Sequence, residues 1–405
     1  MIFLINFSGS RFSLTVCLLV LAFSGCAVAP ATTPGGRETP PPSTAGLNSL
    51  IAVMPVENLT GMPVPVDRVR RSLVQSMKRK GLNVLGDDVL EKVLERHRIR
   101  YTGGLNRELG EAMREETGAN AVLFPTLELF DESNPPKAAL AVRLVAANKN
   151  ANILWMGSVG VAGNDAPGFL LLGLIDDPAV IWENAKDRVL DSLIAYLNGE
   201  TPRDARGVGK KFVPKSFHGV PPKIPAGKET VSVAVLPFRN DSTRRNAGEI
   251  LTLHFTRDLL KKGKLEVVEP GEVRQVLLQS RTIMEGGLSL PQADILHAAL
   301  DVDLVVTGTV TEYQDSIGGG GNPNVEFSVR IFDMKTRQIV WSSTSFNHGD
   351  DGVFFFNLGK VNTAHELASG MVRSVAEKMH AAIGEGMGGG GTGPGGSPQQ
   401  MRLTR

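Results

Sequence analysis

The feature that most constrains this fold is a short stretch of sequence that occurs twice. Residues 51–61 read IAVMPVENLTG, and residues 233–243 read VAVLPFRNDST, which lies 182 positions later (233 − 51). Each copy has an apolar run, a proline, another apolar residue and an asparagine-containing turn. Apolar runs with an adjoining turn arise often by chance, so the significance of the repeat depends on the sequence downstream of each copy.

The same series of patterns continues downstream of both copies. An amphipathic helical stretch, a short strand, two more helical stretches, three strands separated by polar turns, and a long amphipathic helix come after each apolar run. The matching positions recur in order, with offsets from 182 (233 − 51) to 187 (330 − 143). A repeat of this length indicates a duplicated domain, because solenoid repeats have periods of roughly 20–50 residues.

The order of these patterns, β-α-β-α-α-β-β-β-α, predicts the fold of each copy. Strands mixed with helices predict an α/β (α+β) fold, in which helices pack on a mixed sheet. The last three strands should form an antiparallel meander, because only short polar turns join them. The first strand is followed by a helix and should lie parallel to a neighbour. We therefore expect two tandem copies of a mixed-sheet domain.

Changes in composition predict where these domains begin and end. We expect the first domain at 48–198 and the second at 231–383, with a basic Pro/Gly-rich linker at 199–230. Residues 384–405 read as a disordered Gly-rich tail with too little apolar content to fold. The chain is 42% hydrophobic, which is enough to form a core in each domain.

The N-terminus has the pattern of a lipoprotein signal peptide, which we place at 1–25. The uncharged, mostly apolar stretch between Arg11 and Cys26 is about 14 residues long, short of the roughly 20 that span a bilayer as a helix. The sequence FSGC at 23–26 resembles the lipobox of bacterial lipoproteins, in which the cysteine is acylated and becomes the mature N-terminus. We therefore expect lipidation of Cys26; the alternative is an ordinary cleaved signal with an incidental cysteine.

Residues 26–47, directly after the cleavage site, are rich in proline and predict a spacer between the lipid and the folded domains. The residue after Cys26 is Ala27. If sorting resembles that of enterobacterial lipoproteins, an aspartate at this position would favour retention in the inner membrane, and its absence favours the outer membrane. The expected location is therefore the periplasmic face of the cell outer membrane.

Composition and motifs exclude several other functions. A net charge of +1 gives no basic signal, so nucleic acid is not an expected partner. The cysteines are Cys17 and Cys26, both ahead of the folded copies, which excludes a disulfide or a cysteine-based metal site there. The sequence contains no GxSxG elbow and no phosphate-binding loop, and its GxGxxG match at 384–389 lacks a preceding strand. We expect no catalytic, cofactor-binding or metal-binding residue, and no enzyme.

The histidines are scattered, and no HExxH motif relates them. His254 and His297 lie in helical patterns, where a lone histidine is usually a packing or helix-face residue. His348 precedes two aspartates in a polar loop, which is only weak evidence for a metal or catalytic site. The full set is His97, His218, His254, His297, His348, His365 and His380.

Two further stretches have alternative interpretations. The first helical stretch is rich in basic residues, which form either a solvated face or a docking surface for an acidic partner; they are Arg68, Arg70, Arg71, Lys78, Arg79 and Lys80. The apolar runs at Phe169–Ile175 and Val353–Phe356 belong either to a core or to an oligomer or partner interface.

Three patterns within each copy resemble the curli-secretion (CsgG-like) lipoprotein family. They are an apolar strand with proline, a strand that begins like Gly-Ala-Asp, and a strand that ends in tryptophan. In this chain they are Ile51–Val56, Gly118–Pro125, Asn148–Trp155, Val233–Phe238, Asp301–Gly308 and Asp333–Trp341. The family's relatives include penicillin-binding-protein activator lipoproteins and the N-terminal domain of the Tol–Pal propeller protein.

The resemblance implies a bacterial envelope lipoprotein that works through binding or export. The connections at Asp131–Lys137 and Asn148–Asn152 are too short for a membrane-inserted hairpin, whose strands need about 9–11 residues each. The leading hypothesis is therefore a binding scaffold or regulator in envelope assembly or secretion, with an envelope protein as partner. The alternative is a subunit of a curli-type export channel or its accessory ring, which would be a homo-oligomer.

Overall fold

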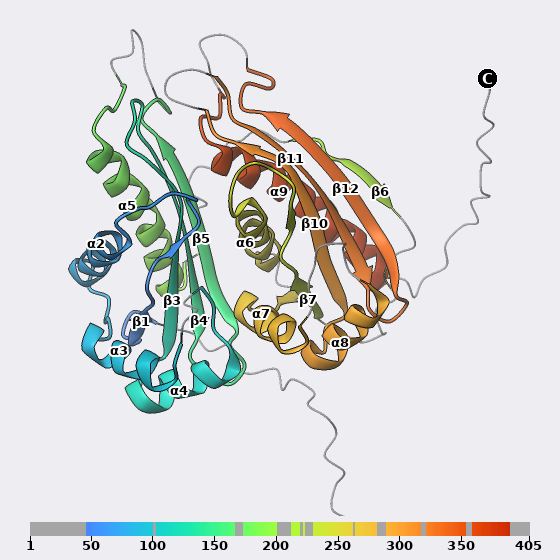
Figure 1. The fold of residues 1–405 in the computed structure, drawn as a ribbon, viewed down its shortest axis with the longest axis horizontal. Coiled ribbons are helices and arrows are strands. Elements are labelled where there is room, and N and C mark those ends of the chain that lie inside the picture. The colour runs from blue at the N-terminus through green and yellow to red at the C-terminus, as the bar shows by residue number, and fades with distance from the viewer. Residues whose placement is uncertain are drawn as a thin grey trace, which may run out of the picture. The chain divides into compact units, whose positions relative to one another are not determined.

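The structure is a computed structural model, and it describes the two duplicated regions almost completely (Figure 1). The described residues are 46–99, 103–166, 173–200, 212–218, 222, 230–261, 264–281, 289–316, 321–353 and 359–388. The predicted signal peptide at 1–25, Cys26 and most of the predicted tail lie outside them. Most of the two apolar runs at Phe169–Ile175 and Val353–Phe356 also lies outside.

The first copy forms one mixed sheet, with the strand order β1-β3-β4-β5. Strand β1 runs parallel to β3, while β3, β4 and β5 form an antiparallel meander. The short strand β2 also pairs with β3, and Val84 forms an isolated bridge with Ile51. The strands are β1 Ile51–Val53, β2 Glu57–Asn58, β3 Ala121–Asp131, β4 Lys137–Ala146 and β5 Ile153–Ala162.

The second copy repeats this arrangement and adds one strand at each side. Its sheet has the order β6-β12-β11-β10-β7-β9, with β8 paired to β10. Strand β7 is parallel to β10 and β9, and β10, β11 and β12 are antiparallel. The strands are β6 Lys215–His218, β7 Val231–Val235, β8 Arg239–Asn240, β9 Leu265–Val267, β10 Leu304–Gln314, β11 Asn324–Asp333 and β12 Gln338–His348. Two tandem mixed sheets of the predicted topology are therefore confirmed.

Both copies place two helices on each face of their sheet. In the first copy, α2 and α5 pack on one face, while α3 and α4 cover part of the other. In the second copy, α6 and α9 pack on one face, while α7 and α8 cover part of the other. The helices are α2 Val66–Arg79, α3 Asp87–Arg96, α4 Arg107–Thr117, α5 Pro178–Leu197, α6 Ala247–Leu260, α7 Pro270–Gln279, α8 Leu290–Leu300 and α9 Ala364–Gly388.

Local sequence explains several of the helix ends. The side chain of Asn106 accepts a hydrogen bond from the Leu109 amide at 2.9 Å and caps the start of α4. Gly118 ends that helix in the left-handed conformation, with φ of 71°, which glycine adopts without a steric penalty. At the start of α8, Ser289 and Gln292 form a reciprocal capping box.

Two details differ from the boundaries expected from sequence. Strand β6 lies within the predicted linker at 199–230, where it pairs antiparallel with β12. Without β6, β12 would be an edge strand with unpaired backbone N–H and C=O groups, and β6 forms hydrogen bonds with some of them. Helix α9 runs to Gly388, past the predicted start of the tail at 384. Among the helices that the structure describes, none combines the length and apolar character needed to cross a membrane.

Candidate functional site

The second copy covers part of the first sheet, on the face opposite α2 and α5. Figure 1 shows α6 and α9 between the two sheets, next to β5. At Gly160 on β5, an added Cβ would lie 2.9 Å from side-chain atoms of both His365 and Glu366 on α9. The contact between the copies is therefore close. We call the region where β3, β4 and β5 of the first copy meet α6, α9 and the start of α7 of the second copy the seam. Its polar residues form the candidate site.

Glu128 reaches the seam from β3 because side chains alternate along a strand, which puts it on the face of Val122 and Phe124, opposite Leu127. The pairing of β3 with β4 shifts register between Leu127 and Leu129, so Glu128 has no partner on β4. Such a register shift is a β-bulge, in which one strand carries an extra residue. The second sheet has a matching shift between Val310 and Glu312. The bulge belongs to the duplicated fold, whereas the glutamate occurs only in the first copy.

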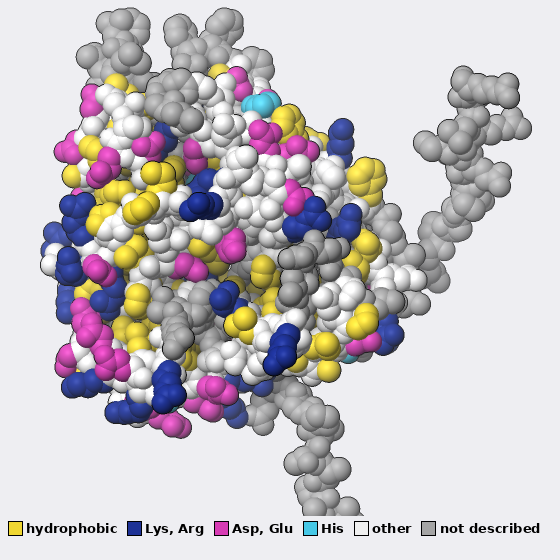
Figure 2. All heavy atoms as spheres, viewed as in Figure 1, with side chains coloured by type: hydrophobic (Ala, Val, Ile, Leu, Met, Phe, Trp, Pro, Cys, Tyr) yellow, Lys and Arg dark blue, Asp and Glu magenta, His cyan; other side chains and the backbone are white. Residues whose placement is uncertain are grey.

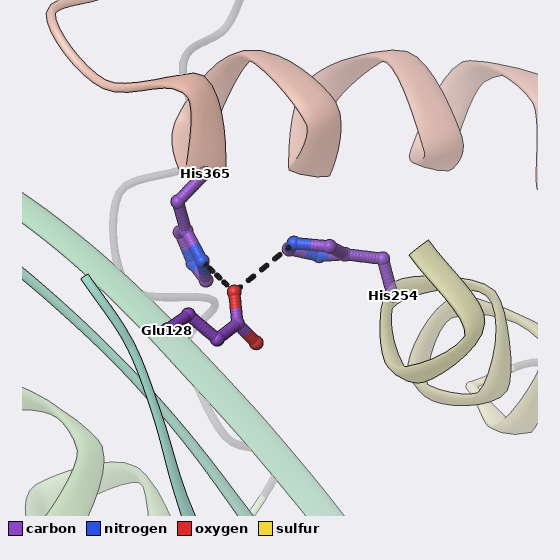
Figure 3. Close-up of side chains that lie close together, drawn as sticks. All are labelled: Glu128, His254 and His365. Atoms are coloured by element: carbon purple, nitrogen blue, oxygen red, sulfur yellow. Dashed lines mark hydrogen bonds and ion pairs between the residues drawn. The ribbon is translucent and has the colours of Figure 1, made fainter. Parts of the chain in front are cut away.

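Two histidines from the second copy meet Glu128 across the seam (Figure 3). Nδ1 of His365, at the start of α9, lies 2.5 Å from Oε2 of Glu128. Nε2 of His254, on α6, lies 3.6 Å from the same oxygen. The two imidazole rings are tilted against each other, with their centroids 4.7 Å apart. One carboxylate oxygen thus faces both rings, and we call these three residues the Glu–His–His cluster.

The cluster is closed to solvent, and part of its hydrogen-bonding capacity is unused. The side chains are only 1–3% exposed. Both ring nitrogens of His254 and Oε1 of Glu128 are buried without a hydrogen-bond partner. Leaving such groups unpaired costs about 1–3 kcal/mol each, so this arrangement needs an explanation.

Burial and charge set the protonation of the cluster. Burial alone would raise the pKa of Glu128, but His365 and His254 beside it hold that pKa well below its usual range. Burial lowers the pKa of His254 to about 4, against a smaller opposing effect of Glu128. Near neutral pH, Glu128 is therefore ionised and His254 is neutral, with lone-pair capacity on its ring.

A layer of hydrogen bonds holds His365 in place. Its Nε2 lies 3.2 Å from Oγ of Ser158 on β5, and the same hydroxyl accepts a hydrogen bond from Arg257. Arg257 also donates to Oγ of Ser369 at 2.9 Å and pairs with Asp258 at 2.5 Å. These contacts fix the ring so that its Nδ1 points to Glu128.

A second buried polar contact crosses the seam between Arg143 and Glu269. Nε of Arg143 on β4 lies 2.9 Å from Oε2 of Glu269, and Nη2 donates to Oε1 at 3.0 Å. Oε1 also accepts from the Leu105 amide at 3.1 Å. Nearby, Gly271 lies so close to Leu105 that an added Cβ would be 2.5 Å from its backbone nitrogen. Burial raises the pKa of Glu269, although Arg143 acts in the opposite direction.

The predicted basic surface on the first helix is present. Figure 2 shows Lys and Arg side chains on the left of the molecule, where α2 lies in Figure 1. Two of these residues hold the first copy together, since Arg70 donates to the Val53 carbonyl at 2.8 Å and Lys80 donates to Asp191 at 2.7 Å. Both interpretations of the remaining basic residues stay predictions.

The cluster cannot be recognised in the sequence. The helical pattern around His254 predicts a packing residue, which describes its position but not its contacts, and nothing in the sequence connects His365 with Glu128. The residues come from β3, α6 and α9, and no local motif relates them. The other histidines considered lie elsewhere: His297 contacts the Val302 carbonyl at 3.0 Å, and His97 contacts Glu116 at 2.5 Å. The predicted lipidation site, Cys26, lies outside the described residues.

Comparison with known proteins gives structural similarities only. No family model matches the chain, and no curated protein matches it. The PelC dodecamer from Paraburkholderia phytofirmans is similar at 16% identity and a TM-score of 0.28, over 40% of this chain and 95% of that one. Lipoprotein GNA1162 from Neisseria meningitidis is similar at 19% identity and a TM-score of 0.26, over 36% of this chain and 99% of that one.

A third similar structure is the C-terminal domain of LpoB from Escherichia coli, at 19% identity and a TM-score of 0.24. The match covers 29% of this chain and 84% of that domain. TM-scores of this size do not establish a function, so a role for this chain has to come from its own residues. Its resemblance to the curli-secretion family stays a prediction.

Proposed function

We propose that the protein is a lipid-anchored binding scaffold or regulator at the periplasmic face of the bacterial outer membrane. In this proposal, acylated Cys26 holds the chain at the membrane, and the proline-rich spacer separates the lipid from the two sheets. The partner is another envelope protein, which binds an exposed surface. The observation that carries the proposal is the lipobox-like FSGC directly ahead of that spacer.

The closed seam supports binding rather than catalysis. Among the described residues, the Glu–His–His cluster is the one group of three His, Cys, Asp or Glu side chains whose ligand atoms lie close enough together to hold a metal ion. Its side chains are 1–3% exposed, so a substrate has no access to them in this conformation. The polar residues across the seam instead hold the two copies together and leave the outer faces to contact a partner.

Fatty-acid labelling tests the anchor. Cells that express the full chain are grown with a radiolabelled fatty acid, and the protein is isolated from the membrane fraction. Wild type should carry the label and Cys26→Ala should not. Cys17→Ala is the matched control, because Cys17 would leave with the signal peptide, and it should be labelled like wild type. Label that persists in Cys26→Ala would refute the anchor.

Isolation from membranes in mild detergent tests the mode of action. A scaffold should be a monomer or dimer and should co-purify with an envelope protein after chemical cross-linking. A ring of eight or more subunits would instead support the alternative, a subunit of an export channel or its accessory ring. The Cys26→Ala variant is the negative control for co-purification, since it should lose partners whose binding depends on membrane attachment.

A further inference from the structure

We infer that Glu128, His254 and His365 form a binding site for one divalent transition-metal ion, best matched by Zn²⁺, which links the two copies of the fold. Imidazole nitrogen and carboxylate oxygen are ordinary zinc ligands. Each of the three residues offers one such atom, and these atoms all lie within 4.8 Å of one another.

The distances fit a metal ion after a small movement of one side chain. Zinc lies about 2.0–2.2 Å from nitrogen and oxygen ligands, so two ligands at a tetrahedral angle are about 3.4 Å apart. Nε2 of His254 and Oε2 of Glu128 are 3.6 Å apart, which matches. Nδ1 of His365 and the same oxygen are 2.5 Å apart, a hydrogen-bond distance. A shift of the Glu128 carboxylate by about 1 Å would open this contact for the ion.

The unpaired atoms are the independent observation that points to a ligand. His254 is buried, yet neither of its nitrogens has a hydrogen-bond partner, and Oε1 of Glu128 has none either. Packing alone would favour an apolar side chain at the position of His254, because an unpaired buried polar group destabilises the fold. A metal ion would supply the missing partner for one nitrogen of His254 and for the carboxylate.

The surroundings of His365 have the pattern found around metal ligands. A ligating histidine usually donates its second ring N–H to an oxygen, which fixes the ring and its tautomer. Nε2 of His365 faces Oγ of Ser158 at 3.2 Å, which leaves Nδ1 for the ion. Arg257 donates to that same hydroxyl and fixes its position.

The choice of metal follows from the ligand types. Mg²⁺ and Ca²⁺ prefer sets made entirely of oxygen ligands, whereas two imidazoles and one carboxylate suit zinc and other late first-row ions. Glu128 would balance half of the added charge, and a water molecule would complete the four ligands. The closed site is not built for turnover, so the ion would have a structural role.

The origin of the ligands predicts when the ion enters. Glu128 comes from the first sheet, while His254 and His365 come from helices of the second copy, and 237 positions separate Glu128 from His365. A complete site therefore exists only when the seam has formed. Uptake should occur during folding and be slow in the native protein, since metal binding and folding are coupled at such sites.

Refolding of the full chain in detergent tests the inference. The protein is unfolded in urea with EDTA, refolded with either Zn²⁺ or Mg²⁺, and dialysed, and bound metal is measured by mass spectrometry. We expect one zinc per chain and no retained magnesium. Co²⁺ loaded in the same way should give the visible absorption of a four-coordinate nitrogen–oxygen site. Zinc should also raise the melting temperature of the refolded protein.

Three variants decide whether the cluster holds the ion. His254→Leu and the near-isosteric Glu128→Gln should each lose at least nine-tenths of the bound zinc. His297→Leu removes a histidine outside the seam and should retain one zinc per chain. Circular dichroism checks that each variant has refolded. Wild type that retains no more zinc than His254→Leu, or Glu128→Gln that retains as much as wild type, would show a hydrogen-bonded cluster only and overturn the inference.

Discussion

The strands β4 and β11 occupy the same position in the two sheets but have different surroundings. All ten residues of β4 are buried, whereas β11 alternates between buried and more exposed residues. Arg143 in β4 and Arg330 in β11 occupy matching positions, each directly after a valine. Arg143 is 1% exposed and forms an ion pair with Glu269, whereas Arg330 is exposed to solvent. The second copy covers this face of the first sheet. On the second sheet, α7 and α8 cover part of the corresponding face, and the alternate residues of β11 there stay partly or fully exposed.

The helices α2 and α6 show the same difference. Both have 14 residues, but five residues of α2 are buried, compared with twelve of α6. Helix α2 presents its other side, rich in arginine and lysine, to solvent. Helix α6 packs on its own sheet and also lies against the first copy at the seam. The duplication therefore fixed the topology of each sheet, whereas the contact between the copies determined which faces became core.

Removal of the buried arginine should give the largest difference between the two copies. Arg143→Met leaves the carboxylate of Glu269 buried without its partner, which should lower the free energy of unfolding by about 3–5 kcal/mol. Arg330→Met, the matched variant in the second sheet, should change it by less than about 0.5 kcal/mol. Urea denaturation measures both. Equal losses would show that the seam does not stabilise the fold as described.

The residues at the two matching bulges, Glu128 and Thr311, should show a smaller difference in stability. Glu128→Ala removes the acceptor for His365 inside the seam and should cost about 1–3 kcal/mol. Thr311→Ala changes the exposed residue at the matching bulge and should cost less than about 0.5 kcal/mol. The measurement is urea denaturation in the presence of EDTA, so that metal does not contribute. A greater loss in Thr311→Ala than in Glu128→Ala would contradict the assignment of the cluster to the seam.

The pH dependence of stability sharpens the role of Glu269. Burial raises the pKa of this carboxyl above its usual value near 4.5, so the folded protein keeps a proton that the unfolded chain releases. Stability should therefore fall as pH rises from about 4.5 to the native pKa, by at most about 1.4 kcal/mol per pH unit. Glu269→Gln should remove this decline, as followed by urea midpoints across that range. An unchanged slope in the variant would assign the decline to another group.

The smallest expected effect is at the exposed side of the first copy. Lys80 joins α2 to α5 through Asp191 at 2.7 Å, and the aspartate side chain is 66% exposed. Lys80→Ala should cost about 0.2–1 kcal/mol, and added salt should reduce the difference from wild type. Thermal unfolding at low and high salt measures it. A loss as large as that of Arg143→Met would mean that this surface pair behaves like the buried one.

Local patterns were sufficient to predict the topology of each copy. The parallel first strand, the antiparallel meander and the order of helices follow from residues that are close in sequence, and the structure confirms them. Strand β6 could not be predicted this way, because Lys215–His218 becomes a strand only by pairing with the open edge of β12. Cys26 and its lipidation stay predictions.

Two features of the sequence fit burial at the seam, although the seam was not predicted from them and neither locates the cluster. The apolar residues of α6 are spread around more of the helix than those of α2, which is typical of a helix buried on more than one side. The segment of β4 is almost continuously apolar, which is typical of a strand covered on both faces. Neither signal identifies the partner surface, since many surfaces satisfy the same burial requirement.

By itself, the sequence determined that one mixed α/β unit is built twice, because the apolar periodicity of each segment specifies its helix or strand and the short turns specify which strands pair. Only the tertiary structure decided that the glutamate of a β3 bulge meets His254 and His365. Those three residues belong to segments whose proximity depends on how two finished sheets pack, and that packing depends on surface shape and burial rather than on any local pattern.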